Sequence, residues 1–161
     1  MKCFNSKILN NIVIIGIVLT LLALLAMPVV LTDILKMDFG ISESSVAIKL
    51  SIGIYMCAVP YVISLFSLKK LCKQISIQNP FSRNVPKYLK QISICAFSEI
   101  LIFNVVQLVL SYFFNIYSYG ITSISVIIVS FVSLGIGIFS IVLGKLFEMA
   151  IEIKEENDKT I

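Results

Sequence analysis

Glu99 is an acidic residue inside a long apolar segment, between the stretches SICAFS and ILIF. An ionised and unpaired carboxylate at such a depth costs at least a few kcal/mol in a bilayer. Intramembrane acids therefore usually face the interior of a protein, where they bind cations or relay protons. On a helix at about 100° per residue, Asn104 and Gln107 lie within about 140° of Glu99. Glu99, Asn104 and Gln107 are therefore the intramembrane polar candidates for binding or transport.

This polar side of the segment has two interpretations. In the functional one, Glu99 lines a pathway or a ligand pocket and binds a cation or relays a proton. In the structural one, Glu99 is protonated and shares an interhelical hydrogen bond with a group at similar depth, such as Tyr61 or Ser64. The sequence leaves both open.

Residues for other kinds of chemistry are scarce. The chain has no histidine, which is the commonest metal ligand and the usual proton-transfer group near neutral pH. Cys3, Cys57, Cys72 and Cys95 are scattered without a CxxC spacing, so they indicate packing rather than a metal or redox site. With neither a nucleophile and base nor a metal cluster, we expect no catalytic residue, no metal, no cofactor and no enzymatic activity.

Composition places these residues in a membrane. The chain is 58% hydrophobic and 14% charged, whereas a soluble domain is about 45–50% apolar and about 25% charged. Four apolar segments are long enough to cross about 30 Å of hydrocarbon, and they lie at about 12–31, 46–71, 89–114 and 121–147. The first exceeds the roughly 7–15 apolar residues of a signal peptide. We therefore expect one membrane domain over residues 1–161, an all-α integral membrane four-transmembrane-helix bundle.

The distribution of basic residues predicts the orientation. Eleven Lys and Arg residues lie at the N-terminus, in the connection at about 69–90, at Lys145 and in the tail at about 146–161, and only Lys36 and Lys49 lie on the opposite side. Loops rich in Lys and Arg stay in the cytoplasm. The sequence therefore predicts a multi-pass protein of the bacterial cytoplasmic membrane with both termini in the cytoplasm.

The connection at about 69–90 has a distinctive motif. Its residues are Asn79, Pro80, Phe81, Ser82, Asn84 and Val85. Pro80 disfavours helix at Asn79, and Ser82 or Asn84 can cap the next helix. The basic residues around the motif suit either a contact with anionic lipid or a docking surface for a protein.

Two further patterns concern the last helix. Small residues recur along one stripe of about 80°, which permits close helix packing; they are Ser130, Ser133, Gly137, Ser140 and Gly144. The stripe faces either the third helix or a second copy of the chain. The tail continues the helical period with acidic residues, and its acidic face is expected near the basic connection. The tail motif comprises Glu155, Glu156, Asn157, Asp158, Thr160 and Ile161.

These two motifs carry a resemblance to a known family. Together with the spacing of Leu89 and Ile92, they make the chain resemble, throughout its length, a bacterial four-helix membrane family known as domain of unknown function 2975. Two residues depart from the family pattern: Pro86 replaces an ordinary helix former, and Lys159 replaces an apolar residue. The resemblance implies a four-helix bundle, no known catalytic residue and a gene beside a small helix-turn-helix DNA-binding regulator.

Because the distinctive residues are cytoplasmic, we expect a non-enzymatic regulatory or interaction protein that acts with a soluble cytoplasmic partner such as that regulator. Direct nucleic-acid binding is not expected, since the basic residues flank apolar segments and form no basic face. The alternative is a small transporter, channel or immunity-type membrane protein that uses the polar side around Glu99. The expected partners are the lipid bilayer, the regulator and, for a homo-oligomer, a second copy of the chain.

Overall fold

The computed structural model describes residues 2–39, 44–76, 81–114 and 119–159. Apart from a short turn at 81–83, these residues form four helices. Their bounds are α1 (Lys2–Phe39), α2 (Ser44–Ser76), α3 (Asn84–Phe114) and α4 (Tyr119–Lys159). Each apolar segment predicted from the sequence lies inside one of these helices, and the tail continues α4 as far as Lys159.

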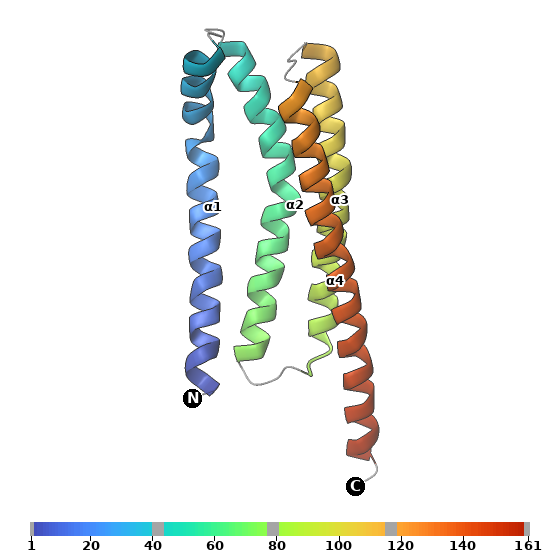
Figure 1. Ribbon diagram of the computed structural model, residues 1–161. Helices are drawn as coiled ribbons and strands as arrows, with labels where there is room; N and C mark the ends of the chain where they lie inside the picture. Colours follow the sequence, from blue (N-terminus) through green and yellow to red (C-terminus); the bar gives the residue numbers. More distant parts are fainter. Residues whose placement is uncertain (1, 40–43, 77–80, 115–118, 160–161) are drawn as a thin grey trace.

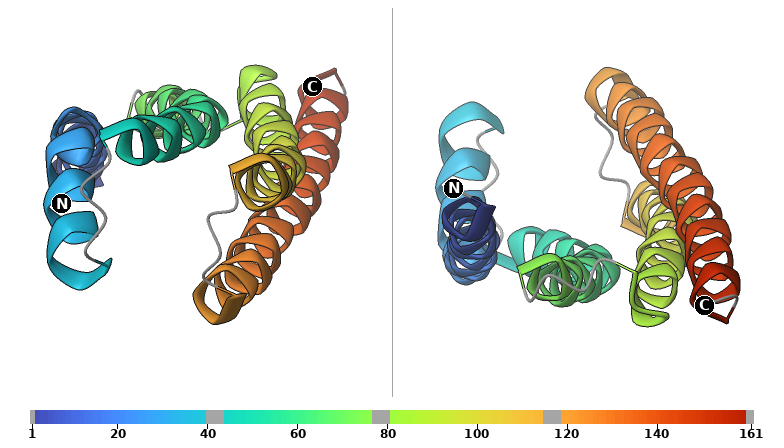
Figure 2. Two further views of the ribbon diagram at one scale, coloured as in Figure 1. Left: turned by 90° about the horizontal axis from the view of Figure 1, so that it is seen from above. Right: turned by 90° about the horizontal axis from the view of Figure 1, so that it is seen from below.

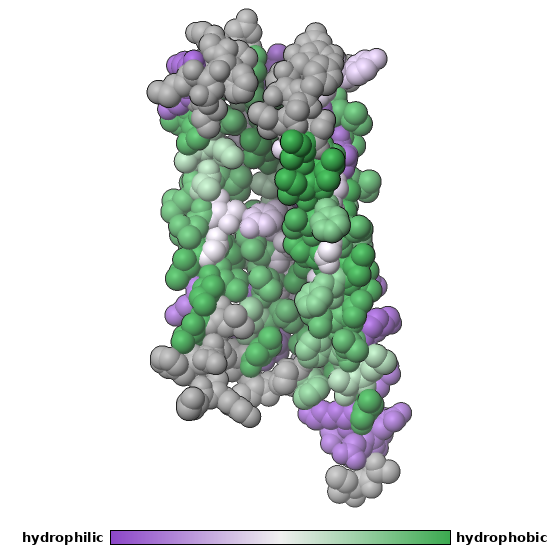
Figure 3. Space-filling model, viewed as in Figure 1, coloured by the Kyte–Doolittle hydropathy of each residue, from purple (hydrophilic) through white to green (hydrophobic). Residues whose placement is uncertain are grey.

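All four helices are long and apolar enough to cross a membrane. Even α3, with 31 residues, extends about 46 Å at a rise of 1.5 Å per residue, which exceeds the hydrocarbon thickness of about 30 Å. Apolar side chains cover the outside: Leu25 is 76% exposed and Phe131 is 77% exposed. Figure 3 shows this apolar surface over the middle of the molecule, with hydrophilic residues toward its ends. Such a surface is stable in lipid and not in water.

The helices form an open row. Within the described residues, α2 packs on α1, α3 on α2, and α4 on α3, and no other pair of helices is in contact. Both views along the helices in Figure 2 show an arc with α1 and α4 at its two ends. The expected bundle is therefore correct in helix number and class, but the first and last helices do not close it. Three sequential contacts hold the arrangement together.

The small-residue stripe of α4 lies against α3. Ser133, Gly137, Ser140 and Gly144 are buried, and a Cβ atom at Gly137 would lie 2.9 Å from the ring of Phe97 on α3. A Cβ atom at Gly53 would similarly lie 2.8 Å from Val106, at the contact of α2 with α3. Of the two partners left open for the stripe, the structure places it against α3. A second copy of the chain would have to use other surfaces, such as the exposed faces of α1 and α4.

Two buried serines of α2 satisfy their hydroxyls within their own helix. Ser51 donates to the carbonyl of Ala47 at 2.8 Å, and Ser67 donates to that of Ile63 at 3.0 Å. A hydroxyl bonded in this way needs no partner across the interface. These small side chains therefore allow helices to approach closely without leaving a buried donor unpaired.

Burial is densest at one end of the row. Both termini and the connection between α2 and α3 lie at this end (Figure 1), which also carries eleven of the thirteen Lys and Arg residues; we call it the basic end. Val85 is 1% exposed, Ser67 2%, and Cys72 and Leu89 4% each. The apolar core of the described chain is therefore centred beside the basic end.

The close contact at Gly137 gives a stability prediction. Gly137→Leu should lower the free energy of unfolding by about 1–3 kcal/mol, the usual cost of overpacking, because its side chain collides with Phe97. Unfolding in mixed detergent micelles, followed by circular dichroism, measures the change. Gly135→Leu is the matched control, since nothing lies within 4 Å of a Cβ atom there. Equal destabilisation by both variants would contradict the assigned contact.

Candidate functional site

The residues of the connection motif begin α3. Ser82 caps this helix: the backbone amide of Asn84 donates to its Oγ at 3.3 Å, and the amide of Val85 donates to its carbonyl at 2.9 Å. Of the two caps considered from the sequence, the structure therefore uses Ser82. Pro86 is buried in the first turn, where a missing N–H removes no helical hydrogen bond. Asn79 and Pro80 lie outside the described residues.

Three apolar residues singled out in the sequence form the core beside this cap. Val85, Leu89 and Ile92 are 1%, 4% and 8% exposed. Their spacing of three and four residues keeps them on one side of α3. A Cβ atom at Gly144 on α4 would lie 3.7 Å from Cβ of Leu89, so α4 crosses α3 closely at this level. The spacing of these three residues thus has a packing role.

The end of α4 lies beside the start of α3 and contacts the connection. Arg83 donates twice to Glu155, from Nε to Oε1 at 2.8 Å and from Nη2 to Oε2 at 2.6 Å. Lys154 Nζ lies 5.5 Å from the centroid of the Phe81 ring, within the range of a cation–π interaction. We call Phe81, Arg83, Lys154 and Glu155 the tail contact. It joins the segments that contain the two motifs, and Arg83 and Glu155 are 72 residues apart in the sequence.

The tail contact is polar and lies at the surface. The side chains of Arg83 and Glu155 are 77% and 40% exposed. The hydrogen bonds and the negative charge of Glu155 raise the pKa of the Arg83 guanidinium above its ordinary value, so Arg83 stays charged at any physiological pH. The acidic tail was expected near the basic connection, and Arg83 is the residue that it meets. Sequence reasoning missed Arg83 and Lys154 as contact residues, although their signs complement Glu155 and an aromatic ring.

The remaining tail residues of the motif point elsewhere. Glu156, Asn157 and Asp158 are exposed on the last turns of α4, and Thr160 and Ile161 lie outside the described residues. Figure 3 shows this hydrophilic end of α4 extending past the apolar part of the molecule. The basic end therefore presents an exposed acidic surface next to the tail contact.

Glu99 lies at the midpoint of α3 and faces α2. Its Oε2 is buried and has no hydrogen-bond partner among the described residues, and Cys57 of α2 lies within its electrostatic reach. The partners considered from the sequence are engaged differently. The Ser64 hydroxyl donates to the Tyr61 carbonyl at 2.7 Å, and the Tyr61 side chain is 49% exposed. Among the described residues, Oε2 of Glu99 thus lacks the interhelical hydrogen bond that the sequence suggested.

Asn104 faces the other neighbour, α4. Its Nδ2 donates to the Ile100 carbonyl at 2.7 Å and to Ser130 Oγ at 3.4 Å. Gln107 is half-buried on the same helix. The shared polar side predicted from the sequence is therefore divided between two interfaces. Glu99 and Asn104 are about 140° apart on α3, so they could share one pocket only if a single neighbouring helix covered both. Here α2 and α4 lie on different sides of α3.

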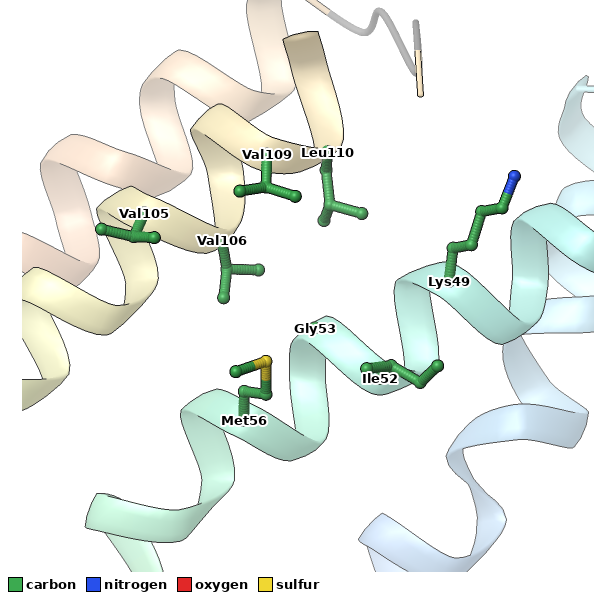
Figure 4. Close-up of a pocket in the computed structure, with 8 residues that line it drawn as sticks. All are labelled: Lys49, Ile52, Gly53, Met56, Val105, Val106, Val109 and Leu110. Atoms are coloured by element: carbon green, nitrogen blue, oxygen red, sulfur yellow. The ribbon is translucent and has the colours of Figure 1, made fainter. Parts of the chain in front are cut away.

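The space in the part of this interface away from the basic end is apolar. A groove of about 290 Å³ lies between α2 and α3, with Lys49 at one end (Figure 4). Its lining comprises Lys49, Ile52, Gly53, Met56, Val105, Val106, Val109 and Leu110. The sequence analysis did not predict this groove, because only the structure shows that Gly53 lies opposite Val106 and Leu110. Glu99 is not part of this lining, so the groove does not form a polar path to the carboxyl.

These features define the class of protein: an all-α integral membrane protein with four candidate spans and no separate soluble domain in the described residues. A family match covers residues 36–161, and the chain belongs to that family, described as "Protein of unknown function (DUF2975)". The chain is 35% identical over 112 residues to "Uncharacterized membrane protein YoaS" of Bacillus subtilis (strain 168), covering 68% of this chain and 69% of that protein. No solved structure matches the chain.

The tail contact gives a prediction for local stability. Glu155→Arg places two like charges together, so amide hydrogen exchange of residues 146–159 should become faster. The charge reversal Arg83→Glu in the same chain should restore slow exchange, because it recreates an opposite pair. Asp158→Arg, with the same charge change on an exposed residue, is the control. Unchanged exchange in Glu155→Arg would show that the pair does not hold the tail.

Proposed function

We propose that this protein is a non-enzymatic regulatory or interaction protein of the bacterial cytoplasmic membrane whose basic end binds a soluble partner in the cytoplasm. The observation that carries the proposal is the tail contact, through which the two motifs of the family meet at one exposed surface. The core beneath it needs only Val85, Leu89 and neighbouring apolar residues. A bidentate pair at 77% and 40% exposure adds little stability, so its function is better explained by recognition.

The proposal includes the orientation of the chain. The positive-inside rule assigns the basic end to the cytoplasm, since it carries eleven of the thirteen Lys and Arg residues. Both termini lie at that end (Figure 1). A cytoplasmic partner then meets the cap of α3 and the tail of α4 together.

The proposed partner is the small helix-turn-helix regulator that the usual gene setting of the family implies. Such a regulator needs a basic surface to bind phosphates, and the exposed acidic residues of the tail, Glu152, Glu156 and Asp158, complement a basic surface. The same acidic residues repel nucleic acid. The membrane protein would thus hold the regulator, and direct contact with DNA would belong to the regulator alone.

Partner binding predicts a specific loss. Full-length protein in detergent should capture the purified neighbouring regulator, and Phe81→Ala combined with Glu155→Gln should weaken that capture by about tenfold or more, as for central interface residues. Tyr112→Ala, an exposed aromatic change on α3 away from the basic end, is the control. Binding of equal strength by all three proteins, or alkaline phosphatase activity from a fusion at the C-terminus, would refute the proposal.

Glu99 supports a second candidate function. A buried carboxyl oxygen without a hydrogen-bond partner in the described chain, at the middle of a membrane helix, suits transient binding of a proton or a cation. This candidate is a small transporter, channel or immunity-type protein. Its weakness is that Asn104, one of the two polar side chains expected beside Glu99, faces α4 instead.

Transport through Glu99 predicts a loss of flux. Glu99→Gln keeps the shape of the side chain but removes its charge, so proton or sodium flux into proteoliposomes should fall at least tenfold, and Glu99→Asp should retain part of it. Asn104→Leu, on the face toward α4, is the control for damage to packing. Flux of Glu99→Gln equal to that of the unmodified protein would remove this candidate.

A further inference from the structure

A second groove lies between α3 and α4 at the basic end. Its volume is about 410 Å³, and it combines charged and apolar residues. Its lining comprises Pro86, Lys90, Ser93, Ile94, Phe97, Ser140, Ile141, Gly144, Lys145 and Glu148. Its lining includes two small buried residues of α4, Ser140 and Gly144, and larger apolar side chains of both helices. None of its lysines belongs to the tail contact.

The two lysines mark the same level of the membrane on two different helices. Lys90 adjoins Leu89 and Lys145 adjoins Gly144, and a Cβ atom at Gly144 would lie 3.7 Å from Cβ of Leu89. Beyond Lys145 toward the outer end, residues 119–144 of α4 carry no charge, and beyond Lys90, residues 91–114 of α3 carry only Glu99. Lys90 and Lys145 are therefore the first cations met on leaving the hydrocarbon core. That is the level of phospholipid phosphates.

The apolar part of the groove continues into the lipid region. Ile94 is 59% exposed and Ile141 is 46% exposed, so both line the side that faces the bilayer. Phe97, held against Gly137, closes the groove at its deeper end. The groove is therefore apolar along its length and positively charged at the end nearest Lys90 and Lys145.

We propose that this groove binds one anionic phospholipid of the bilayer, with its phosphate between Lys90 and Lys145 and an acyl chain along Ile94, Phe97 and Ile141. Basic pockets between membrane helices bind anionic head groups in this way. A soluble anion would leave the apolar part of the groove unfilled. A zwitterionic lipid would place its own cationic group near the two lysines. The lipid would also join α3 to α4 at the level of the core.

Glu148 also lines the groove and fits this arrangement. Its Oε2 accepts from Lys145 Nζ at 2.7 Å, and the Lys145 side chain is 74% exposed. An ammonium group has three donors, so this pair leaves Lys145 able to bond a phosphate while fixing its direction along α4. Lys90 forms no ion pair within the described residues, and the lining keeps a net positive charge of two lysines against one glutamate.

The test uses the full chain in dodecyl maltoside with dioleoylphosphatidylglycerol, dioleoylphosphatidylcholine or inorganic phosphate, and native mass spectrometry measures bound lipid. Phosphatidylglycerol should bind on the order of thirtyfold more weakly to Lys90→Gln/Lys145→Gln than to the unmodified chain, at about fivefold per lysine. Lys69→Gln/Lys70→Gln, the same charge change on α2 at the same end, should bind it normally. Dihexanoylphosphatidylglycerol should bind weakly, because its chains do not fill the groove.

Each contrary outcome overturns the proposal. Equal loss in both double variants would reveal only general surface charge, and equal binding of phosphatidylcholine would remove the selection for an anionic lipid. Displacement of the lipid by inorganic phosphate would identify a site for free anions. If the glutamine variants fail to fold, as judged by gel filtration and circular dichroism, the three ligands tested on the unmodified chain still decide the matter.

Discussion

The close approach of neighbouring helices is the interaction on which this structure depends. Lipid tails are as apolar as leucine side chains, so burial of apolar area gives membrane helices no net reason to associate. What remains is dense packing over short distances, which needs small residues where helices touch. Gly53 against Val106 and Gly137 against Phe97 supply it on the two sides of α3. The most apolar helix, α1, has few buried residues in its span, which agrees with its place at the end of the row.

This constraint explains why more residues are buried toward the basic end. Halfway along the helices, each helix has a neighbour on one or two sides only, and its remaining surface is exposed for lipid. At the basic end, the cap by Ser82, the core around Val85 and Leu89, and the returning tail of α4 add polar and apolar contacts together. At that end water is present, so charged and polar side chains can contribute to the contacts. In the bilayer core the contacts depend mainly on the size of the side chains. The connection motif and the tail motif lie where both kinds of contact occur.

The sequence predicted the features that follow from hydrophobic length and missed those that follow from partner choice. Helix number, class and the helical continuation of the tail follow from periodicity, because bilayer thickness and the 3.6-residue repeat fix them. The division of Glu99 and Asn104 between two interfaces could not be predicted, since a helical wheel gives angles on α3 but not the directions of α2 and α4. The open row was missed for the same reason. Whether the small-residue stripe faced α3 or a second copy also required knowledge of the neighbours.

The same reasoning ranks the sites within the molecule. Glu99 has the residue type expected of a functional group, but its interface is tight at Gly53 and Val106, and the nearby groove is apolar. The basic end has residues of ordinary type, yet it brings together parts of the chain that are distant in sequence and leaves them exposed. Burying the Glu99 carboxyl in a membrane helix costs free energy that the fold must offset. The tail contact at the surface has no such cost and adds little stability. The convergence at the basic end is therefore the stronger argument for function.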